Sequence, residues 1–334
     1  MKHLIKLSTL LLVIVFSFFS CTKEDDLAIT GHDQAISEKS MNFPDEIPLP
    51  NGFNPEGIVA GNGNTLYVGS LFDGSIYSID SRTGEGSIIV PAQANRIAVG
   101  LDFDTRTGYI FVAGGTDGFG YVYDSQTGAE IAAIQLTTAT FPNAMINDVV
   151  VTELAAYFTN SSAAEIYKVP LNSDGTLPAG VAAQTIALTG DFTLVTGFNA
   201  NGIVANDDGS QLIIVNSASG TLYLTDAGTG MTTEIDLGSS DVINGDGLVL
   251  RGNKLYVVQN FSNQVSVVML SGDWLSGSII ETITDPDFQI PATATLKGNT
   301  LYVVNTRFDV APPPFFGQGY DPNIEFNVVA VDAN

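Results

Sequence analysis

The feature that most constrains this chain is a strand–turn–strand unit that occurs six times. One copy is NGDGLVLRGNKLYVVQN at residues 244–260, in which Gly252-Asn253 separates two apolar runs, as in a two-residue hairpin. Alignment of the six copies brings six residues to one position, with spacings of 44, 47, 54, 45 and 46: Glu56, Gly100, Asn147, Asn201, Asp246 and Ala292. A strand-only repeat with this period predicts an all-β fold, a six-bladed β-propeller.

The repeat also predicts one domain rather than the two that a length of 334 residues would suggest. Each blade buries its faces against its neighbours, so all six are needed together. The second runs of the units are continuously apolar, such as LYVV and LIIV, as expected of strands covered on both faces. Residues 43–50 precede the first unit and occupy the slot of a fourth strand. We therefore expect this N-terminal strand to complete blade six and close the ring, which removes the exposed sheet edges.

The charge of the chain excludes some partners. Twelve basic and 36 acidic residues give a formal net charge of −24. Nucleic acid is excluded because a phosphate backbone requires a basic surface, and an anionic membrane surface would repel the globular part. Solubility is one interpretation of this charge, and contact with divalent cations is another. We expect a monomer that binds a small molecule.

The N-terminal segment has the features of a bacterial lipoprotein signal. Residues 1–20 combine a basic start with an apolar core of 13 residues at 7–19, which is too short to span a bilayer. Cys21, the only cysteine, follows at the position of a lipidated residue. Residues 21–42 form a polar tether, and 43–334 the propeller. This predicts a lipid anchor on the outer membrane, on its surface or periplasmic side; the alternative is an ordinary cleaved signal. Membrane association of a Cys21→Ala variant would contradict the anchor.

Four of the six aligned residues are oxygen donors at positions that are otherwise apolar: Glu56, Asn147, Asn201 and Asp246. The first strand of a propeller blade lies beside the central channel, so its start places a side chain at the channel mouth. Two carboxylates and two amides suit Ca²⁺, although another divalent cation could bind. The predicted propeller contains no cysteine or histidine, which argues against zinc or copper held by those ligands.

Strand direction predicts a second layer on the same face. If the first strands begin there, the second strands end there, at Ser70, Asn160, Asn216, Gln259 and Asn305. We expect Ser70, Asn160, Asn216 and Asn305 to contact substrate, although turn chemistry also explains single asparagines. Loops on this face carry several phenylalanines, among them Phe72, Phe119, Phe141, Phe192, Phe198, Phe261 and Phe308. A polar centre with an aromatic wall is typical of ligand pockets, and inter-blade packing is the alternative for each ring.

Blade six alone has a long connection between its second and third strands, TRFDVAPPPFFGQGYDPNI at 306–324. Pro312-Pro313-Pro314 stiffens this segment, and Phe315, Phe316 and Tyr320 give it apolar surface to bury. We predict a lid over the channel mouth, with a surface loop as the alternative. Arg307 at its base is expected to meet an anionic substrate.

The order of these short motifs resembles the gluconolactonase and senescence-marker-protein family, to which diisopropyl fluorophosphatase is related. The matching residues are Glu56 in EGIV, Asn147 in IND, Asn201 in NGIV and Asp246 in DGLV, and the resemblance covers about residues 45–334. It implies a six-bladed propeller with a metal, usually calcium, in the channel and Asp246 as general base or nucleophile. The chain departs from the family at Met145, where gluconolactonases carry an arginine that helps to hold a sugar lactone.

These observations predict a calcium-dependent hydrolase of lactone or ester type at the channel mouth. The cation would polarise the substrate carbonyl, and Asp246 would activate water or attack directly. The alternative is a non-catalytic cell-surface propeller that binds a ligand or a protein and holds a structural metal. Fold alone does not separate the two.

Overall fold

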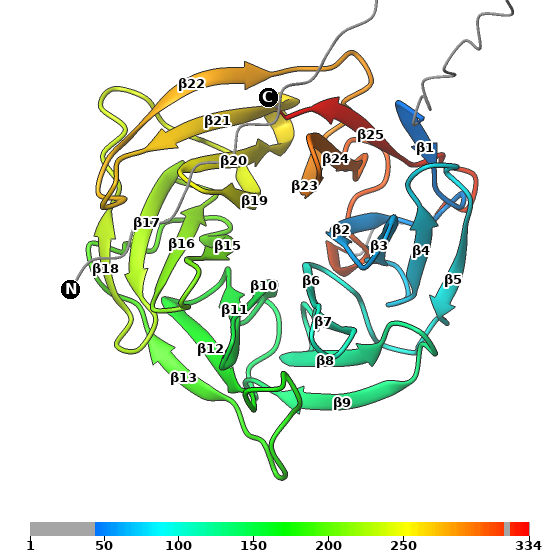
Figure 1. The fold of residues 1–334 in the computed structure, drawn as a ribbon, viewed down its shortest axis with the longest axis horizontal. Coiled ribbons are helices and arrows are strands. Elements are labelled where there is room, and N and C mark those ends of the chain that lie inside the picture. The colour runs from blue at the N-terminus through cyan, green and yellow to red at the C-terminus, as the bar shows by residue number, and fades with distance from the viewer. Residues whose placement is uncertain (1–43, 317–320, 334) are drawn as a thin grey trace, which may run out of the picture. The chain divides into compact units, whose positions relative to one another are not determined.

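The computed structural model describes residues 44–316 and 321–333, and in it the chain forms a six-bladed β-propeller (Figure 1). The six blades are separate sheets of four or five strands. The first strand of each blade lies at the centre and the last at the rim, and neighbouring strands within a blade are antiparallel apart from one short addition. The predicted fold class is confirmed.

The strands follow one another blade by blade. Blade one contains β2 (Pro55–Ala60), β3 (Thr65–Ser70), β4 (Ile76–Asp80) and β5 (Gly86–Val90). Blade two contains β6 (Leu101–Asp104), β7 (Tyr109–Ala113), β8 (Phe119–Asp124) and β9 (Glu130–Gln135). Blade three contains β10 (Ile146–Val151), β11 (Ala155–Asn160), β12 (Glu165–Pro170) and β13 (Gln184–Ala187).

The second half repeats this order. Blade four contains β15 (Ala200–Ala205), β16 (Gln211–Asn216), β17 (Thr221–Asp226) and β18 (Met231–Glu234), with β14 (Thr189–Gly190) added in parallel at the rim. Blade five contains β19 (Gly245–Arg251), β20 (Lys254–Gln259), β21 (Gln264–Leu270) and β22 (Gly277–Ile283). Blade six contains β23 (Pro291–Lys297), β24 (Thr300–Asn305), β25 (Asn327–Asp332) and β1 (Glu46–Pro48). Two short 3-10 helices are η1 (Asn260–Ser262) and η2 (Pro314–Phe316).

The N-terminal strand closes the ring, as predicted. β1 pairs antiparallel with β25, and Ile47 lies opposite Val328 (Figure 1). Both side chains are fully buried in the cluster between blades six and one. The predicted signal peptide (1–20), the lipidation site Cys21 and the tether (21–42) lie outside the described residues. Within the described part, no helix has the length and hydropathy that crossing a membrane requires.

The core consists of six hydrophobic clusters, one at each interface between neighbouring blades. The second strands contribute to the clusters on both sides; in β16, Leu212 and Ile214 pack toward blade three, while Ile213 and Val215 pack toward blade five. All four are fully buried, which explains why these runs are continuously apolar. Gly252-Asn253 joins β19 to β20 with Gly252 at φ +60°, as the hairpin signal predicted.

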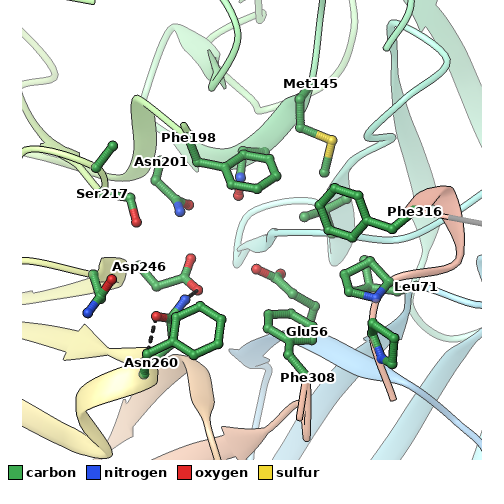
Figure 2. Close-up of a pocket in the computed structure, with 17 residues that line it drawn as sticks. Glu56, Leu71, Met145, Phe198, Asn201, Ser217, Asp246, Asn260, Phe308 and Phe316 are labelled. Atoms are coloured by element: carbon green, nitrogen blue, oxygen red, sulfur yellow. Dashed lines mark hydrogen bonds between the residues drawn. The ribbon is translucent and has the colours of Figure 1, made fainter. Parts of the chain in front are cut away.

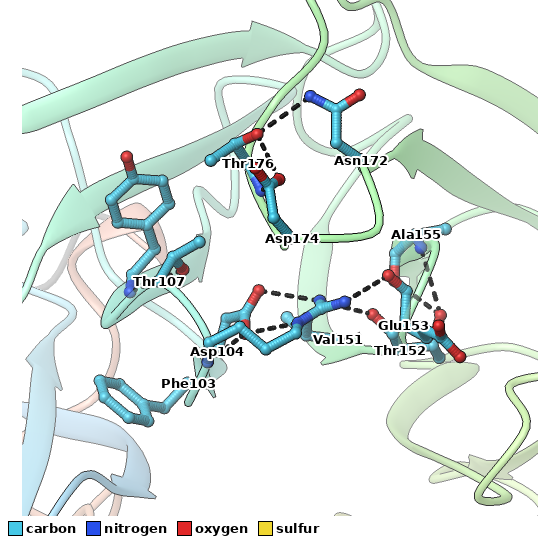
Figure 3. Close-up of polar contacts among 12 residues, drawn as sticks. Phe103, Asp104, Thr107, Val151, Thr152, Glu153, Ala155, Asn172, Asp174 and Thr176 are labelled. Atoms are coloured by element: carbon cyan, nitrogen blue, oxygen red, sulfur yellow. Dashed lines mark hydrogen bonds and ion pairs between the residues drawn. The ribbon is translucent and has the colours of Figure 1, made fainter.

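At the far end of the inner strands, polar contacts join blades two and three (Figure 3). Arg106, in the turn after β6, forms an ion pair with Asp104, in which Nη2 lies 2.8 Å from Oδ2. The same guanidinium donates to the carbonyl oxygens of Thr152 and Glu153 in the next blade. Asp104 is buried and its charge is balanced by Arg106, so these contacts link blades two and three at this end of the inner strands.

Candidate metal and ligand site

The ring residues stand at irregularities in the innermost strands. In five blades the pairing of the first and second strands shifts register at the ring position: between Pro55 and Ile58, Ile146 and Val149, Ala200 and Ile203, Gly245 and Leu248, and Pro291 and Thr293. Such a bulge re-aims a side chain that a regular strand would pack against its neighbour. The four predicted donors, Glu56, Asn147, Asn201 and Asp246, all line one pocket of about 320 Å³ at this end of the channel.

Glycine beside the ring lets the blades approach closely. A Cβ on Gly57 would lie 2.1 Å from the carbonyl oxygen of Val99, and one on Gly202 would lie 2.1 Å from that of Asp246. In blade two the ring position itself is Gly100, where a Cβ would lie 2.1 Å from Oδ1 of Asp148. Blade two therefore has no room for a ring side chain, because the first strand of blade three occupies that space.

Two buried carboxyl groups, Glu56 and Asp246, point toward one another across the pocket (Figure 2). They are only 5% and 4% exposed. Oδ2 of Asp246 accepts a hydrogen bond of 2.9 Å from Nδ2 of Asn260, whereas Oε2 of Glu56 is buried and has no hydrogen-bond partner among the described residues. Removing such a group from water without a partner is costly, so Glu56 is the part of the pocket that most requires a ligand.

The two carboxyl groups can stay buried side by side only if protons or a bound cation reduce their negative charge. Burial, and then the charges of Asp246 and Asp148, raise the pKa of Glu56 well above its ordinary value. Burial likewise raises the pKa of Asp246 to about 7, although side-chain hydrogen bonds from Asn260 and Asn201 act in the opposite direction. Desolvation disfavours both anions and each charge disfavours the other, so a bound cation would stabilise the ionised pair.

The two amides are placed to complete the donor set. Nδ2 of Asn147 donates a hydrogen bond of 2.9 Å to Oγ of Ser161. The amide oxygen of Asn147 is therefore the atom that can coordinate a cation. Asn201 interacts with Asp246 through its side chain and lies beside it in Figure 2. Two carboxylates and two amides are hard oxygen donors and fit Ca²⁺. No group of three or more His, Cys, Asp or Glu side chains in the described ranges could hold a metal, so a site here depends on the asparagines.

The sequence analysis missed two carboxyl groups deeper in the channel, the buried Asp148 and the partly buried Asp102. Asp148 accepts from the backbone N–H groups of Val149 and Ile203, which joins blades three and four, and burial raises its pKa to about 7. Asp102 accepts from Val151 in the next blade, and burial raises its pKa to about 6. Their one sequence signal is an acidic residue within an inner strand, where apolar side chains are expected.

The predicted substrate-binding residues at the ends of the second strands do not line the pocket. Asn160, Asn216 and Asn305 are fully buried, and Ser70 is 1% exposed. Their polar atoms hold loops instead: Asn160 accepts from the N–H groups of Met145 and Ser162, and Asn305 accepts from Gln289 and donates to Asp287. Ser70 donates to the carbonyl oxygen of Phe53, and Asn216 donates to that of Thr193. They are anchors of the pocket-side loops.

In three blades, the residue after the end of the second strand faces the channel instead. Leu71, Ser217 and Asn260 line the pocket, and each follows the last residue of a second strand. Side chains alternate along a strand, so a shift of one residue reverses the face. Asn260, the partner of Asp246, was missed for this reason. Asn244 also lines the pocket, with a backbone φ of +61°.

Arg307 does not reach the pocket. Its Nη1 donates to the carbonyl oxygen of Glu325 at 3.4 Å, and its Nε lies 3.8 Å from Oδ1 of Asp309. The backbone of Arg307 is in the left-handed region, with φ at +54°. No lysine, arginine or histidine occurs among the described residues that line the pocket. The expectation that Arg307 meets an anionic substrate therefore has no support in this arrangement.

The blade-six connection lies on the pocket face, as predicted. Phe308, Pro312, Pro313 and Phe316 line the pocket. The ring of Phe316 makes edge contacts with Phe141 and Phe198, at centroid distances of 6.2 and 6.4 Å. Of the seven phenylalanines expected around the mouth, Phe198, Phe261 and Phe308 line the pocket, while Phe119 and Phe192 pack in inter-blade clusters.

Comparison with known proteins supports the fold and no more. No family model and no curated protein matches the chain. Among solved structures, regucalcin of Agrobacterium tumefaciens, described as a calcium-binding protein, superposes with a TM-score of 0.59 at 15% identity, covering 87% of this chain and 96% of its own. A luciferin-regenerating enzyme gives a TM-score of 0.58 at 12% identity, covering 85% and 92%. The Malassezia sympodialis allergen Mala s 1 gives 0.58 at 12%, covering 86% and 96%.

Proposed function

We propose that this protein is a calcium-dependent hydrolase of small esters or lactones, acting in the pocket at the start of the inner strands. The observation that carries the proposal is the buried pair of carboxyl groups, with Oε2 of Glu56 lacking a partner among the described residues. Buried charges are normally paired or bound to metal. The pair opens directly onto a pocket, which is where a substrate carbonyl could reach it.

The residues present fit a calcium ion. Glu56, Asn147, Asn201 and Asp246 would hold it, and another divalent cation with a preference for oxygen could take its place. A bound ion supplies Lewis-acid polarisation of an ester or lactone carbonyl. Asn260 holds one oxygen of Asp246 and so fixes the direction of the carboxylate, which can accept a proton from an attacking water molecule.

The solved structures favour this proposal through the printed descriptions of two of them. Regucalcin is described as calcium-binding, and the luciferin-regenerating protein as an enzyme. At identities of 12–15% they support it only through the shared fold. We infer that the chain is a divergent relative of the gluconolactonase and senescence-marker-protein family. Met145 lines the pocket where that family has an arginine, so a sugar lactone would lose a polar partner.

A second candidate is a non-catalytic propeller that binds a ligand beside a structural ion. One observation favours it. Both amides near Asp246, those of Asn260 and Asn201, direct hydrogen bonds to its carboxyl group, and the pocket-lining residues that the structure describes include no histidine to serve as a separate base. If these interactions persist with calcium bound, Asp246 would act as a ligand and not as a base.

A panel of lactones and esters separates the two candidates. Wild-type protein with calcium should hydrolyse at least one compound, and chelator should abolish turnover. Asp246→Asn retains an amide oxygen at the same place but loses the base, so kcat should fall by about 10²–10⁴-fold. Calcium titration and a melting curve of the same variant show whether it still folds. Ligand binding without turnover in any member of the panel would favour the non-catalytic candidate.

A further inference from the structure

The pocket has two chemically different sides (Figure 2). Asn201, Ser217, Asp246 and Asn260 come from blades four and five and form a polar side. The opposite side is mostly apolar and includes Leu71, Met145 and Phe316, while Glu56 lies on that side with its carboxyl group directed toward Asp246. A substrate that satisfies both sides must have a polar group at one end and an apolar body at the other.

The apolar side is completed by the blade-six connection. This segment leaves blade six after Asn305, yet Phe316 contacts Phe141, before β10 of blade three, and Phe198, before β15 of blade four. Residues 306–316 therefore extend from one side of the mouth to the other. Phe308 and Pro312 line the pocket along this path, so the connection forms part of its wall.

Charge narrows the class of substrate further. The lining residues of the described structure include Glu56 and Asp246 but no cationic side chain. The protein as a whole carries a formal charge of −24. An anionic substrate would find no cationic side chain among these described lining residues, and the net negative charge would repel it during approach. A polyhydroxylated substrate would leave its hydroxyl groups facing Leu71, Met145 and Phe316, where desolvation is not compensated.

We propose that the substrate is an uncharged ester or lactone with an apolar body, and that Phe316 limits the size of that body. The proposal rests on the hydrolase function above. The carbonyl end lies at Glu56 and Asp246, and the body packs against Phe198, Phe308 and Phe316. Phe316 lines the pocket and is half exposed, so its ring lies between the apolar side and the solvent.

The test compares γ-butyrolactone, γ-nonalactone and D-glucono-δ-lactone by kcat/KM in the full chain with calcium. We expect γ-nonalactone to exceed gluconolactone by about tenfold or more, because apolar contacts discriminate at this level. Phe316→Ala should raise the relative kcat/KM for lactones bulkier than γ-nonalactone and lower it for γ-nonalactone. Phe72→Ala is the matched control, since Phe72 is a partly exposed phenylalanine on a loop of the same face that does not line the pocket.

A second measurement does not depend on turnover. Binding of the neutral fluorescent probe N-phenyl-1-naphthylamine to the Asp246→Asn variant should persist and weaken about tenfold when Phe198→Ala or Phe316→Ala is added. If the protein binds the probe but hydrolyses none of the lactones, the proposed hydrolase function is contradicted. The pocket is then a binding site for apolar ligands. If the protein hydrolyses gluconolactone at least as efficiently as γ-nonalactone and does not bind the probe, the proposal of an apolar substrate is contradicted. The proposed hydrolase function is then retained.

Discussion

Two sets of buried polar side chains lie at the same end of this propeller and differ in how their hydrogen bonds are used. The ring set is Glu56, Asn147, Asn201 and Asp246; the anchor set is Ser70, Asn160, Asn216 and Asn305. Each anchor is bonded to loop backbone, whereas Oε2 of Glu56 in the ring lacks a partner among the described residues. Both sets are buried, but the ring set includes two carboxyl groups, one of them with an unpartnered oxygen, whereas the polar atoms of the anchors are used to hold loops.

The largest effect should come from breaking an anchor. Asn160→Ala removes the acceptor for the N–H groups of Met145 and Ser162 and leaves a void in the protein interior. We expect the free energy of unfolding to fall by about 3–4 kcal/mol, measured by urea denaturation. Asn62→Ala, at an exposed asparagine in the turn between β2 and β3, is the control and should change it by less than about 0.5 kcal/mol. Equal effects of the two variants would contradict the anchor role.

The next effect concerns the ring. Calcium at about 100 times its dissociation constant should stabilise the protein by roughly 2.7 kcal/mol, which raises the melting temperature by about 5 °C or more. Glu56→Gln should lose most of this gain and, without metal, should melt no lower than wild type, because it removes a buried charge that has no partner. Glu85→Gln, at an exposed glutamate, should keep the full calcium shift. A wild-type melting curve that neither calcium nor chelator moves would remove the main support for the metal site.

The smallest effect is a dependence of folding stability on pH. It should come from the carboxyl groups of the channel and not from the anchor residues. Burial raises the pKa of Asp246 and of Asp148 to about 7, and that of Asp102 to about 6, above the ordinary value of 3.8. The folded state therefore holds more protons than the unfolded state between about pH 4 and 7, so stability is highest at the acidic end and is lost as pH rises.

Because of these raised pKa values, the melting temperature of the metal-free protein should fall by a few degrees from pH 5 to pH 8. Scanning calorimetry measures this change. Calcium should reduce the fall, because the ion binds the ionised carboxylates of Glu56 and Asp246 and so favours the folded state at high pH. Asn216→Ala, an anchor variant, should melt lower at every pH but with the same slope. A melting temperature of the metal-free wild type that rises over this range would show that the deep carboxyl groups are ionised in the folded protein.

Much of the ring could be predicted because repetition makes equivalent positions visible. Glu56, Asn147, Asn201 and Asp246 align in the sequence, and all four line the same pocket. The long connection of blade six could be placed on this face because strand direction alternates within a blade. Asn260 could not be found in this way, since the alignment selected Gln259, the last residue of β20, and the next side chain is the one that faces the channel.

The sequence by itself determined the number of blades, the strand that closes the ring and the four aligned polar residues that line the pocket, because these depend on period and hydrophobic pattern alone. Tertiary structure decided which neighbouring side chain faces the channel, because a bulge or a turn shifts the alternation by one residue. It also showed why the ring position of blade two is a glycine, since Asp148 of the next blade fills the space that a side chain at Gly100 would need, and it decided that Arg307 points to Glu325. These outcomes depend on contacts between segments far apart in the chain, and a local pattern does not contain them.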